Sequence, residues 1–173
     1  MRWTVVHESP GNAGTSTATA PAVEATATAL VELRGAGEVL EVPATLRDAG
    51  QLAEHLGVPL AAVATTAVLR TRDGGRLLVV ASAAHPILPA VLAGVLSEPE
   101  LTWDDDTDVL RCTGSVLGSA SPIGLTAQLP TFVDVALAPY PAVWVPAGHP
   151  HAVFRTRYDE LLRLTSGHPV EIG

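Results

Sequence analysis

Alternating hydrophobic and polar residues predict several short β-strands in this chain. Glu38-Val-Leu-Glu-Val42 alternates with a period of two, as a half-buried strand does. Two apolar runs, residues 66–71 and 76–81, flank Asp73-Gly74-Gly75, and this combination indicates a β-hairpin. Further strands are predicted over residues 117–119, 131–133, 142–145 and 151–155.

Helix signals lie between these runs. Thr45 is a suitable N-cap, with Asp48 three residues later, for a helix that ends at Gly57. A last helix over Tyr158–Thr165 has Gly167 as a natural C′ residue. The other helical segments are a short turn over 59–63 and an apolar helix over 86–96. Because strands outnumber helices, the pattern predicts an α/β (α+β) single domain with a mixed, curved sheet and helices packed outside it.

The N-terminal part of the chain has a different composition from the rest. Residues 8–29 are rich in Ala, Thr, Ser and Gly, which predicts a flexible segment. Trp3–Val6 could form a short edge strand before it. We therefore divide the chain into residues 1–29, a low-complexity flexible segment, and residues 30–173, a folded domain.

The overall composition is that of one globular domain. The chain has 173 residues, of which 47% are hydrophobic. Its apolar stretches are too short to cross a membrane, and its N-terminus lacks the apolar segment of a secretory leader. Cys112 is the single cysteine, so we interpret it as a small packed residue in a reducing compartment. These features predict a cytoplasmic protein.

The charged residues of the chain indicate which classes of partner it can bind. The formal net charge is −8, and all ten basic residues are arginine, so the chain has no lysine. Phosphate neutralisation provides most non-specific affinity for nucleic acid, which makes an acidic chain without basic clusters a poor non-specific binder. Four aspartates, Asp104, Asp105, Asp106 and Asp108, are assigned to the acidic first turn of a short helix. A divalent-cation site is the alternative, but the run lacks calcium-loop spacing and we predict no metal.

The most informative pattern lies within residues 111–149. A Gly-x-x-x-Pro loop begins at Gly118 and ends at Pro122. The glycine lets backbone N–H groups approach a ligand, and the proline stiffens the loop. Such a loop suits the binding of a carbonyl, a developing oxyanion or a ribose hydroxyl, and a tight turn without a ligand is the alternative. Asp134 follows at a strand end, and residues 146–150 form a Pro-Ala-Gly-His-Pro loop.

This ordered set of motifs resembles the YbaK / prolyl-tRNA synthetase-associated editing-domain superfamily, over residues 38–173. The resemblance implies an aminoacyl-tRNA deacylase of translation quality control, in which water attacks the ester at the tRNA 3′ end. It implies no cofactor and no protein nucleophile. The implied catalytic residues are Gly118, Ser119, Thr65 and His149, and the implied substrate-binding residues are Ala120, Ser121, Pro122, Thr66, Gly148 and Asp134.

One position departs from the family pattern. The family pocket contains a lysine followed by a hydroxylated residue, and here Thr65 and Thr66 stand at those two positions. Threonine can donate one hydrogen bond but lacks the charge with which an ammonium group polarises an ester. Arg70 lies at an odd offset from Thr65 and so on the opposite face of the strand. Arg72 or Arg111 could reach the pocket from elsewhere in the chain.

His149 matches the family's Ala-Gly-His position. A histidine that titrates near neutrality could orient water or contact a ribose, and a loop histidine bonded to the backbone is the alternative. His149 and His151 share a strand face, but Pro150 lies between them and no third ligand is near, so we predict no metal here. We interpret Asp134 as a cap or as a group that orients a neighbouring loop, and a direct catalytic role is the alternative.

Two functions follow. The first is a trans-editing protein that hydrolyses the ester of a small mischarged amino acid on tRNA, with a pocket that selects by size. The residues expected to form the walls of this pocket are Leu117, Ala120, Ile123 and Val68. The second is a disarmed or repurposed relative that binds a small molecule or a protein partner. The intact loop favours the first, and the missing lysine and the acidic charge favour the second.

Overall fold

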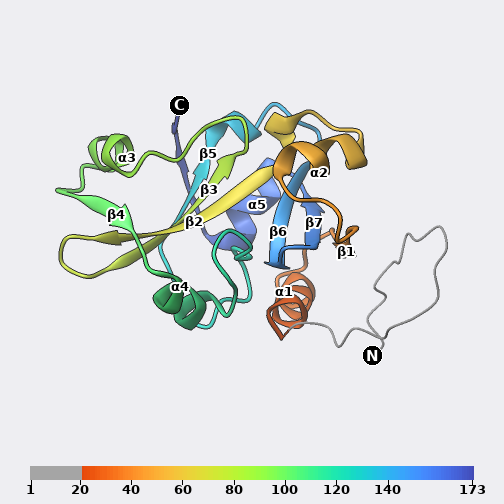
Figure 1. The fold of residues 1–173 in the computed structure, drawn as a ribbon, viewed down its shortest axis with the longest axis horizontal. Coiled ribbons are helices and arrows are strands. Elements are labelled where there is room, and N and C mark those ends of the chain that lie inside the picture. The colour runs from red at the N-terminus through yellow and green to blue at the C-terminus, as the bar shows by residue number, and fades with distance from the viewer. Residues whose placement is uncertain (1–20) are drawn as a thin grey trace.

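Two β-sheets lie side by side in the structure, a computed structural model that describes residues 21–173 (Figure 1). The larger sheet has the strand order β4-β2-β3-β5-β8, and the smaller has the order β1-β7-β6. The strands are β1 (Val39–Glu41), β2 (Ala64–Thr71), β3 (Arg76–Ser82), β4 (Leu101–Trp103), β5 (Thr131–Asp134), β6 (Val143–His149), β7 (Ala152–Thr156) and β8 (His168–Val170). The α-helices of the described residues are α1 (Pro21–Glu32), α2 (Ala49–Leu56), α3 (Pro89–Leu96), α4 (Asp106–Thr113) and α5 (Tyr158–Thr165).

This arrangement confirms the α/β single domain and the hairpin. β2 and β3 pair antiparallel around the predicted turn, whereas β3 pairs parallel with β5, so the larger sheet is mixed as expected. The pattern did not predict that β1, β7 and β6 form a separate sheet. A single parallel bridge between Val63 and Trp144 joins the edge of β6 to the start of β2. The predicted strand Trp3–Val6 lies outside the described residues.

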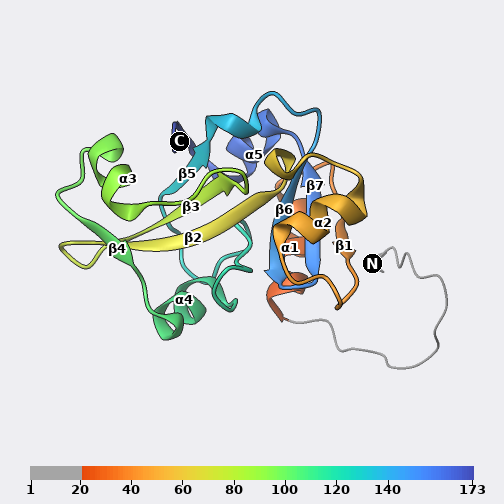
Figure 2. The ribbon, with the colours of Figure 1, turned by 45° about the horizontal axis from the view of Figure 1, so that its top comes forward.

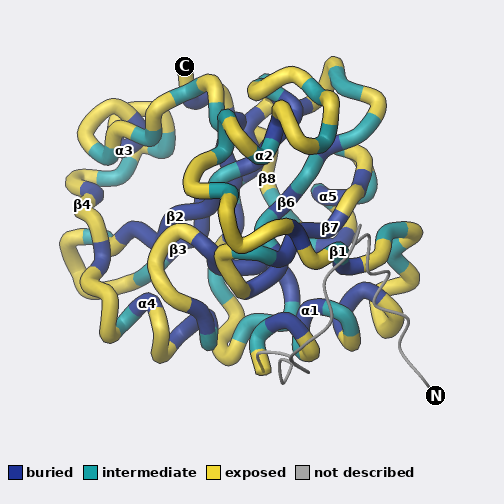
Figure 3. The backbone as a smooth tube through the Cα atoms, turned by 45° about the vertical axis from the view of Figure 1, so that its right-hand side comes forward, coloured by how far each residue is buried: buried dark blue, intermediate teal, exposed yellow. Residues whose placement is uncertain are grey.

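Apolar side chains cover both faces of the larger sheet. Val68 of β2 and Leu78 and Val80 of β3 point into a core shared with the smaller sheet, while Leu69 and Val79 belong to a second cluster under α3. Burial on both faces explains why these strands read as continuous apolar runs. Figure 3 shows the resulting distribution, with buried residues along the central strands and exposed ones on the outer loops and helix faces.

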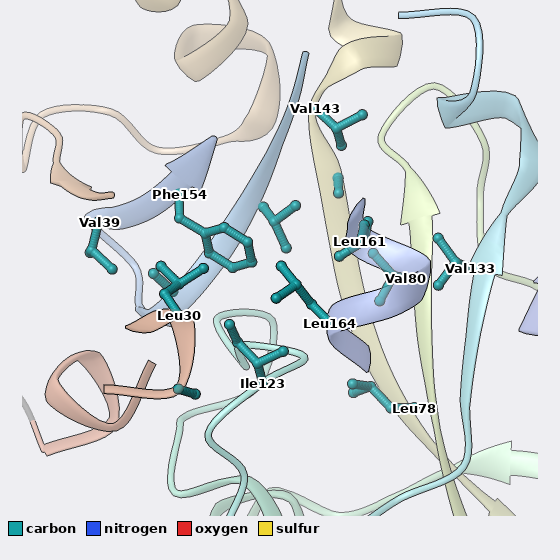
Figure 4. Close-up of a cluster of buried hydrophobic side chains, with 14 of the residues drawn as sticks. Leu30, Val39, Leu78, Val80, Ile123, Val133, Val143, Phe154, Leu161 and Leu164 are labelled. Atoms are coloured by element: carbon teal, nitrogen blue, oxygen red, sulfur yellow. The ribbon is translucent and has the colours of Figure 1, made fainter. Parts of the chain in front are cut away.

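The shared core lies between the two sheets and α5. Phe154 of β7 is fully buried and points toward Leu30 of α1 and Leu164 of α5 (Figure 4). Helix α5 buries Leu161 and Leu164, which are three residues apart on one face. Fully burying such a side chain contributes about 1.5–3 kcal/mol.

Three predicted helix ends are displaced, and the first is the start of α3, which lies at Pro89 and not at residue 86. Asp48, and not Thr45, is the N-cap of α2, because its extended backbone lets the carboxylate accept from the Gln51 amide at 2.8 Å. Gly57 closes that helix in the left-handed conformation, as expected. At the end of α5 the left-handed position belongs to Ser166, with φ +48°, and not to Gly167.

Residues 21–29 are not a flexible segment, which corrects the prediction for this part of residues 1–29. They form most of α1, which lies beside the end of β6 in both ribbon views (Figures 1 and 2). Val23, Thr26 and Leu30 are buried, and the Thr26 hydroxyl contacts the carbonyl of Ala147 at 3.1 Å. Their spacing is that of one helix face, but a composition of Ala and Thr conceals it. No helix in residues 21–173 is long and apolar enough to cross a membrane.

Candidate functional site

Gly118 occupies the third position of a tight turn and is not in a strand. The Ser119 amide donates to the Val116 carbonyl at 3.1 Å, and Gly118 has φ +80°. A turn of this kind requires positive φ at its third residue, and glycine adopts it without steric cost. The strand predicted over Leu117–Ser119 is therefore wrong. The Gly118 N–H has no acceptor within residues 21–173, so it is available to a ligand.

Two hydrogen bonds hold the loop that follows. The Thr66 hydroxyl of β2 donates to the Ala120 carbonyl at 2.8 Å, and the Gly148 amide of β6 donates to the Ser119 carbonyl at 2.9 Å. Both contacts join segments that are far apart in the sequence. They fix the position of the Gly-x-x-x-Pro loop relative to β2 and to the β6–β7 hairpin.

A pocket of about 440 Å³ opens beside this loop. We call it the Gly118 pocket. Three segments contribute its candidate residues: Thr65 from β2, Gly118 and Ser119 from the loop, and His149 from the end of β6. Its other lining residues are Leu46, Arg47, Asp48, Ala49, Leu52, Val63, Ala64, Leu117, Pro146, Pro150, His151, Ala152 and Val153. The four residues predicted as catalytic thus line one cavity.

The predicted substrate-binding residues do not line it. Ala120 and Ser121 are buried behind the turn, and the Ser121 hydroxyl accepts from the Ile123 amide at 3.3 Å. Pro122, Thr66 and Gly148 are also buried and belong to the support of the loop.

Of the predicted walls, Leu117 alone lines the pocket. Ala120 is buried behind the turn, while Val68 and Ile123 belong to the shared core. The expected strand faces misplaced Ala120 and Ile123 because the loop turns at Gly118 and does not continue as a strand. Val68 lies at an odd offset from Thr65 and so on the other face of β2, which packs in the shared core.

Asp134 also lies outside the pocket, as a capping residue. Its side chain is 1% exposed and accepts from the amides of Ser82 and Ala136, each at 3.0 Å. His85 Nδ1 lies 3.2 Å from the same carboxylate. This geometry agrees with the interpretation of Asp134 as a cap that orients a neighbouring loop.

Arg47 is a pocket residue that the sequence reasoning missed. It is exposed, it lies one residue before the N-cap of α2, and it is the one arginine among the residues that line the Gly118 pocket. The two arginines proposed from the sequence do not reach this pocket. Arg111 forms an ion pair with Asp108 at 2.6 Å, and Arg72 lies in the β2–β3 turn.

The histidine pair has a defined hydrogen-bond pattern. His149 Nδ1 accepts from the His151 amide at 3.1 Å, and the two rings meet edge to face with centroids 5.4 Å apart. A neutral His149 with an accepting Nδ1 carries its proton on Nε2, and that N–H is the group it can offer to a ligand. His151 Nδ1 is buried without a partner among the described residues.

The acidic run forms the predicted helix start. Asp105 caps α4 by accepting from the Asp108 amide, and carboxylate oxygens of Asp104, Asp105 and Asp108 lie within 4.8 Å of one another. Arg76 contacts both Asp104, at 2.5 Å, and Asp108. Asp104 raises the pKa of the Arg76 guanidinium, as a neighbouring carboxylate does. Arg76 and Arg111 therefore neutralise the negative charge of the carboxylates, and a bound metal cation would depend on that charge.

Cys112 is packed in the core and lies outside the Gly118 pocket. Burial raises the pKa of its thiol, so the nucleophilic thiolate is disfavoured. This agrees with a structural and not a catalytic cysteine.

Comparison with known proteins connects this geometry to one family. The model of the family described as aminoacyl-tRNA editing domain matches residues 44–164. A proline–tRNA ligase of Trichlorobacter lovleyi is 30% identical over 87 residues, which are 50% of this chain and 15% of that enzyme. The chain thus matches only a small part of that ligase.

Two solved structures share the fold over nearly their whole length. One is described as a candidate trans-editing enzyme for prolyl-tRNA synthetase, with 27% identity and a TM-score of 0.81, covering 90% of this chain and 100% of that one. The other comes from work on epitope backbone grafting onto scaffold proteins, with 28% identity and a TM-score of 0.81, covering 88% of this chain and 99% of that one.

Proposed function

Because the chain belongs to the aminoacyl-tRNA editing domain family, we propose that it is a cytoplasmic trans-editing hydrolase of mischarged tRNA. Its substrate is the ester between a small amino acid and the 3′ end of tRNA. Water attacks the ester carbonyl carbon, and the bond from that carbon to the ribose oxygen breaks. The products are the free amino acid and a tRNA with its terminal hydroxyl restored.

The observation that carries this proposal is the meeting of Thr65, Gly118 and His149 at one cavity. These residues come from β2, the Gly-x-x-x-Pro loop and the β6–β7 hairpin. A volume of about 440 Å³ lies in the ordinary range of small-ligand sites.

Each residue has a role that its geometry supports. The free Gly118 N–H would donate to the carbonyl oxygen as negative charge develops on it, and one such donor contributes roughly 10²–10³-fold in rate. His149 would donate from Nε2 to the ester or to a ribose hydroxyl, since its Nδ1 is occupied by the His151 amide.

Thr65 would offer its hydroxyl to substrate or water, because that hydroxyl has no partner within residues 21–173. Ser119 would contribute through the shape of the turn, because its own hydroxyl donates to the Val116 carbonyl. The remaining predicted residues, Thr66, Ala120, Ser121, Pro122, Gly148 and Asp134, would act by holding these groups in place.

A specific observation favours a second function. With no lysine in the chain and Thr65 at the lysine position, the pocket lacks the ammonium group that the family resemblance implies. A relative that lost this charge would keep the pocket and bind a small molecule without hydrolysing an ester.

A deacylation assay on a panel of mischarged tRNAs separates the two functions. The wild-type protein is compared with Gly118→Val, Thr65→Lys and the control Gly57→Val. Gly57 also has positive φ and open space where a side chain would go, but it lies at the end of α2 and outside the pocket. Turnover that is lost in Gly118→Val and kept in Gly57→Val supports the hydrolase.

An inert wild-type protein that Thr65→Lys activates supports the disarmed relative. No turnover from any variant on any tRNA contradicts the proposal of an editing enzyme.

A further inference from the structure

Arg47 differs from the other arginines of the described residues in its place, because it alone lines the Gly118 pocket. Its guanidinium has no ion pair or hydrogen bond within the described residues, although its backbone amide donates to Gln51 Oε1 at 2.7 Å. By contrast, the guanidinium groups of Arg76, Arg111, Arg157 and Arg163 are all paired with carboxylates. An unpaired cation at a cavity of an acidic protein is available to an anionic ligand.

The surroundings of Arg47 do not already neutralise it. Asp48 is the one acidic residue among those that line the Gly118 pocket, and its carboxylate accepts from the Gln51 amide as the cap of α2. Arg47 therefore brings a positive charge that no described group compensates by contact. A guanidinium offers a planar fork of donors, which matches the oxygens of a phosphate.

The position of Arg47 indicates which part of a substrate it would meet. Gly118 and Ser119 belong to the turn at one wall of the pocket, and Arg47 lies on a different wall, the segment that leads into α2, with an exposed side chain. A reacting ester placed at the Gly118 amide leaves the rest of the tRNA 3′ end to run out past the pocket mouth. The nearest negative charges in that strand are its phosphodiester groups.

We propose that Arg47 binds a phosphodiester group of the tRNA 3′ end at the mouth of the Gly118 pocket. This inference rests on the proposed function, and it makes Arg47 a substrate-binding residue and not a stabiliser of the reacting ester. The pocket would then distinguish an aminoacyl ester on RNA from the same ester on a free nucleoside.

Two probes test this assignment. One is an RNA hairpin with a single-stranded CCA end whose terminal ribose carries alanine through a non-hydrolysable amide. The other is the 3′-alanylamido derivative of adenosine, which has no phosphate. Binding of each is measured at several salt concentrations to the full-length wild-type protein, Arg47→Ala, Arg47→Lys and the control Arg70→Ala.

Arg70 is a suitable control because it is also exposed and unpaired but lies near the far end of β2. Both alanine variants change the net charge equally, so a difference between them reports position and not total charge.

We expect Arg47→Ala to weaken hairpin binding about tenfold or more, since a hydrogen bond to a charged group contributes that much. The slope of log K against log salt should fall by about 0.7, the value for one phosphate of a single strand. Arg47→Lys should retain most of that slope. Adenosine-probe binding should be the same in all four proteins, and Arg70→Ala should bind the hairpin like the wild type.

The inference is overturned if Arg47→Ala and Arg70→Ala bind the hairpin equally well. It is also overturned if Arg47→Ala weakens both probes to the same extent, because the arginine would then contact the ester or the nucleoside. A failure of the proposed function gives a different result from a failure of this inference. In that case the wild-type protein binds the hairpin through Arg47 but hydrolyses no aminoacyl-tRNA.

Discussion

Replacing Gly148 with alanine tests whether the packing of α1 supports the candidate site. Gly148 has φ +96°, and its amide donates to the Ser119 carbonyl of the Gly-x-x-x-Pro loop. An alanine Cβ at this position would lie 2.8 Å from the carbonyl carbon and from the Cβ of Ala22, and 2.9 Å from its oxygen. Real Cβ atoms do not approach backbone so closely, so α1 or the hairpin must move.

The magnitude follows from two separate costs. A non-glycine residue in the left-handed region costs about 1–2 kcal/mol. Overpacking against a backbone that cannot move aside costs a further 1–3 kcal/mol, approximately. Gly57→Ala incurs only the first cost, because Gly57 has φ +66° and no atom within 4 Å of the added Cβ. We therefore expect Gly148→Ala to be the less stable of the two by about 2 kcal/mol.

Thermal and urea unfolding of the two variants measure this difference. For a domain of this size, 2 kcal/mol corresponds to a Tm that is lower by roughly 4–8 °C. Deacylation by Gly148→Ala, measured well below its Tm, should also fall, because the clash moves the residue that holds the Ser119 carbonyl. Equal stability of Gly148→Ala and Gly57→Ala would refute the close packing of α1 on the hairpin.

Three further predictions concern buried polar groups. Arg76→Ala should lower the free energy of unfolding more than Arg111→Ala does, because it leaves the Asp104 carboxylate, whose side chain is 0% exposed, without its cation. Arg111→Ala should cost under about 1 kcal/mol, since this arginine is 73% exposed, and urea unfolding compares the two. Asp134→Ala removes the acceptor of two backbone N–H groups and should lower the unfolding free energy by about 2–3 kcal/mol in the same assay, so wild-type stability would contradict its role as a cap. Cys112 should resist alkylation by iodoacetamide at pH 8 until the protein unfolds, because a raised thiol pKa lowers the thiolate fraction at that pH, and rapid labelling of folded protein would show the thiol to be accessible.

Local sequence signals were enough to predict those helices and strands whose formation depends mainly on their own residues. The β2–β3 hairpin follows from two apolar runs around Asp73-Gly74-Gly75, and α5 follows from an amphipathic run over Tyr158–Thr165. The acidic start of α4 follows from the preference of carboxylates for a helix N-terminus. In each case propensity, turn chemistry and burial agree, so no tertiary information is needed.

The elements missed depend on contacts between distant segments. Leu117–Ser119 reads as an apolar strand, but the hydrogen bond from Ser119 to Val116 makes it a turn. Arg47 was missed for a similar reason. A search for a cation along β2 reaches Arg70 and Arg72, whereas the pocket wall comes from a segment that precedes β2 by almost twenty residues. Spacing along the chain cannot reveal which segment closes a cavity.

The composition of α1 is explained by what it packs against. The φ angles of Gly124 and Gly148 are both positive, and a Cβ on either would lie 2.9 Å or less from the backbone of α1. The backbone of α1 can lie this close to Gly124 and Gly148 only if small residues stand on both contacting segments. The Ala- and Thr-rich composition of α1, which suggests flexibility, is therefore what this close packing requires. The family match begins at residue 44, yet α1 contacts the hairpin that holds the Gly-x-x-x-Pro loop. We therefore include Pro21–Glu32 in the folded unit, which does not begin at residue 30, because the geometry of the Gly118 pocket depends on a helix that precedes the matched region.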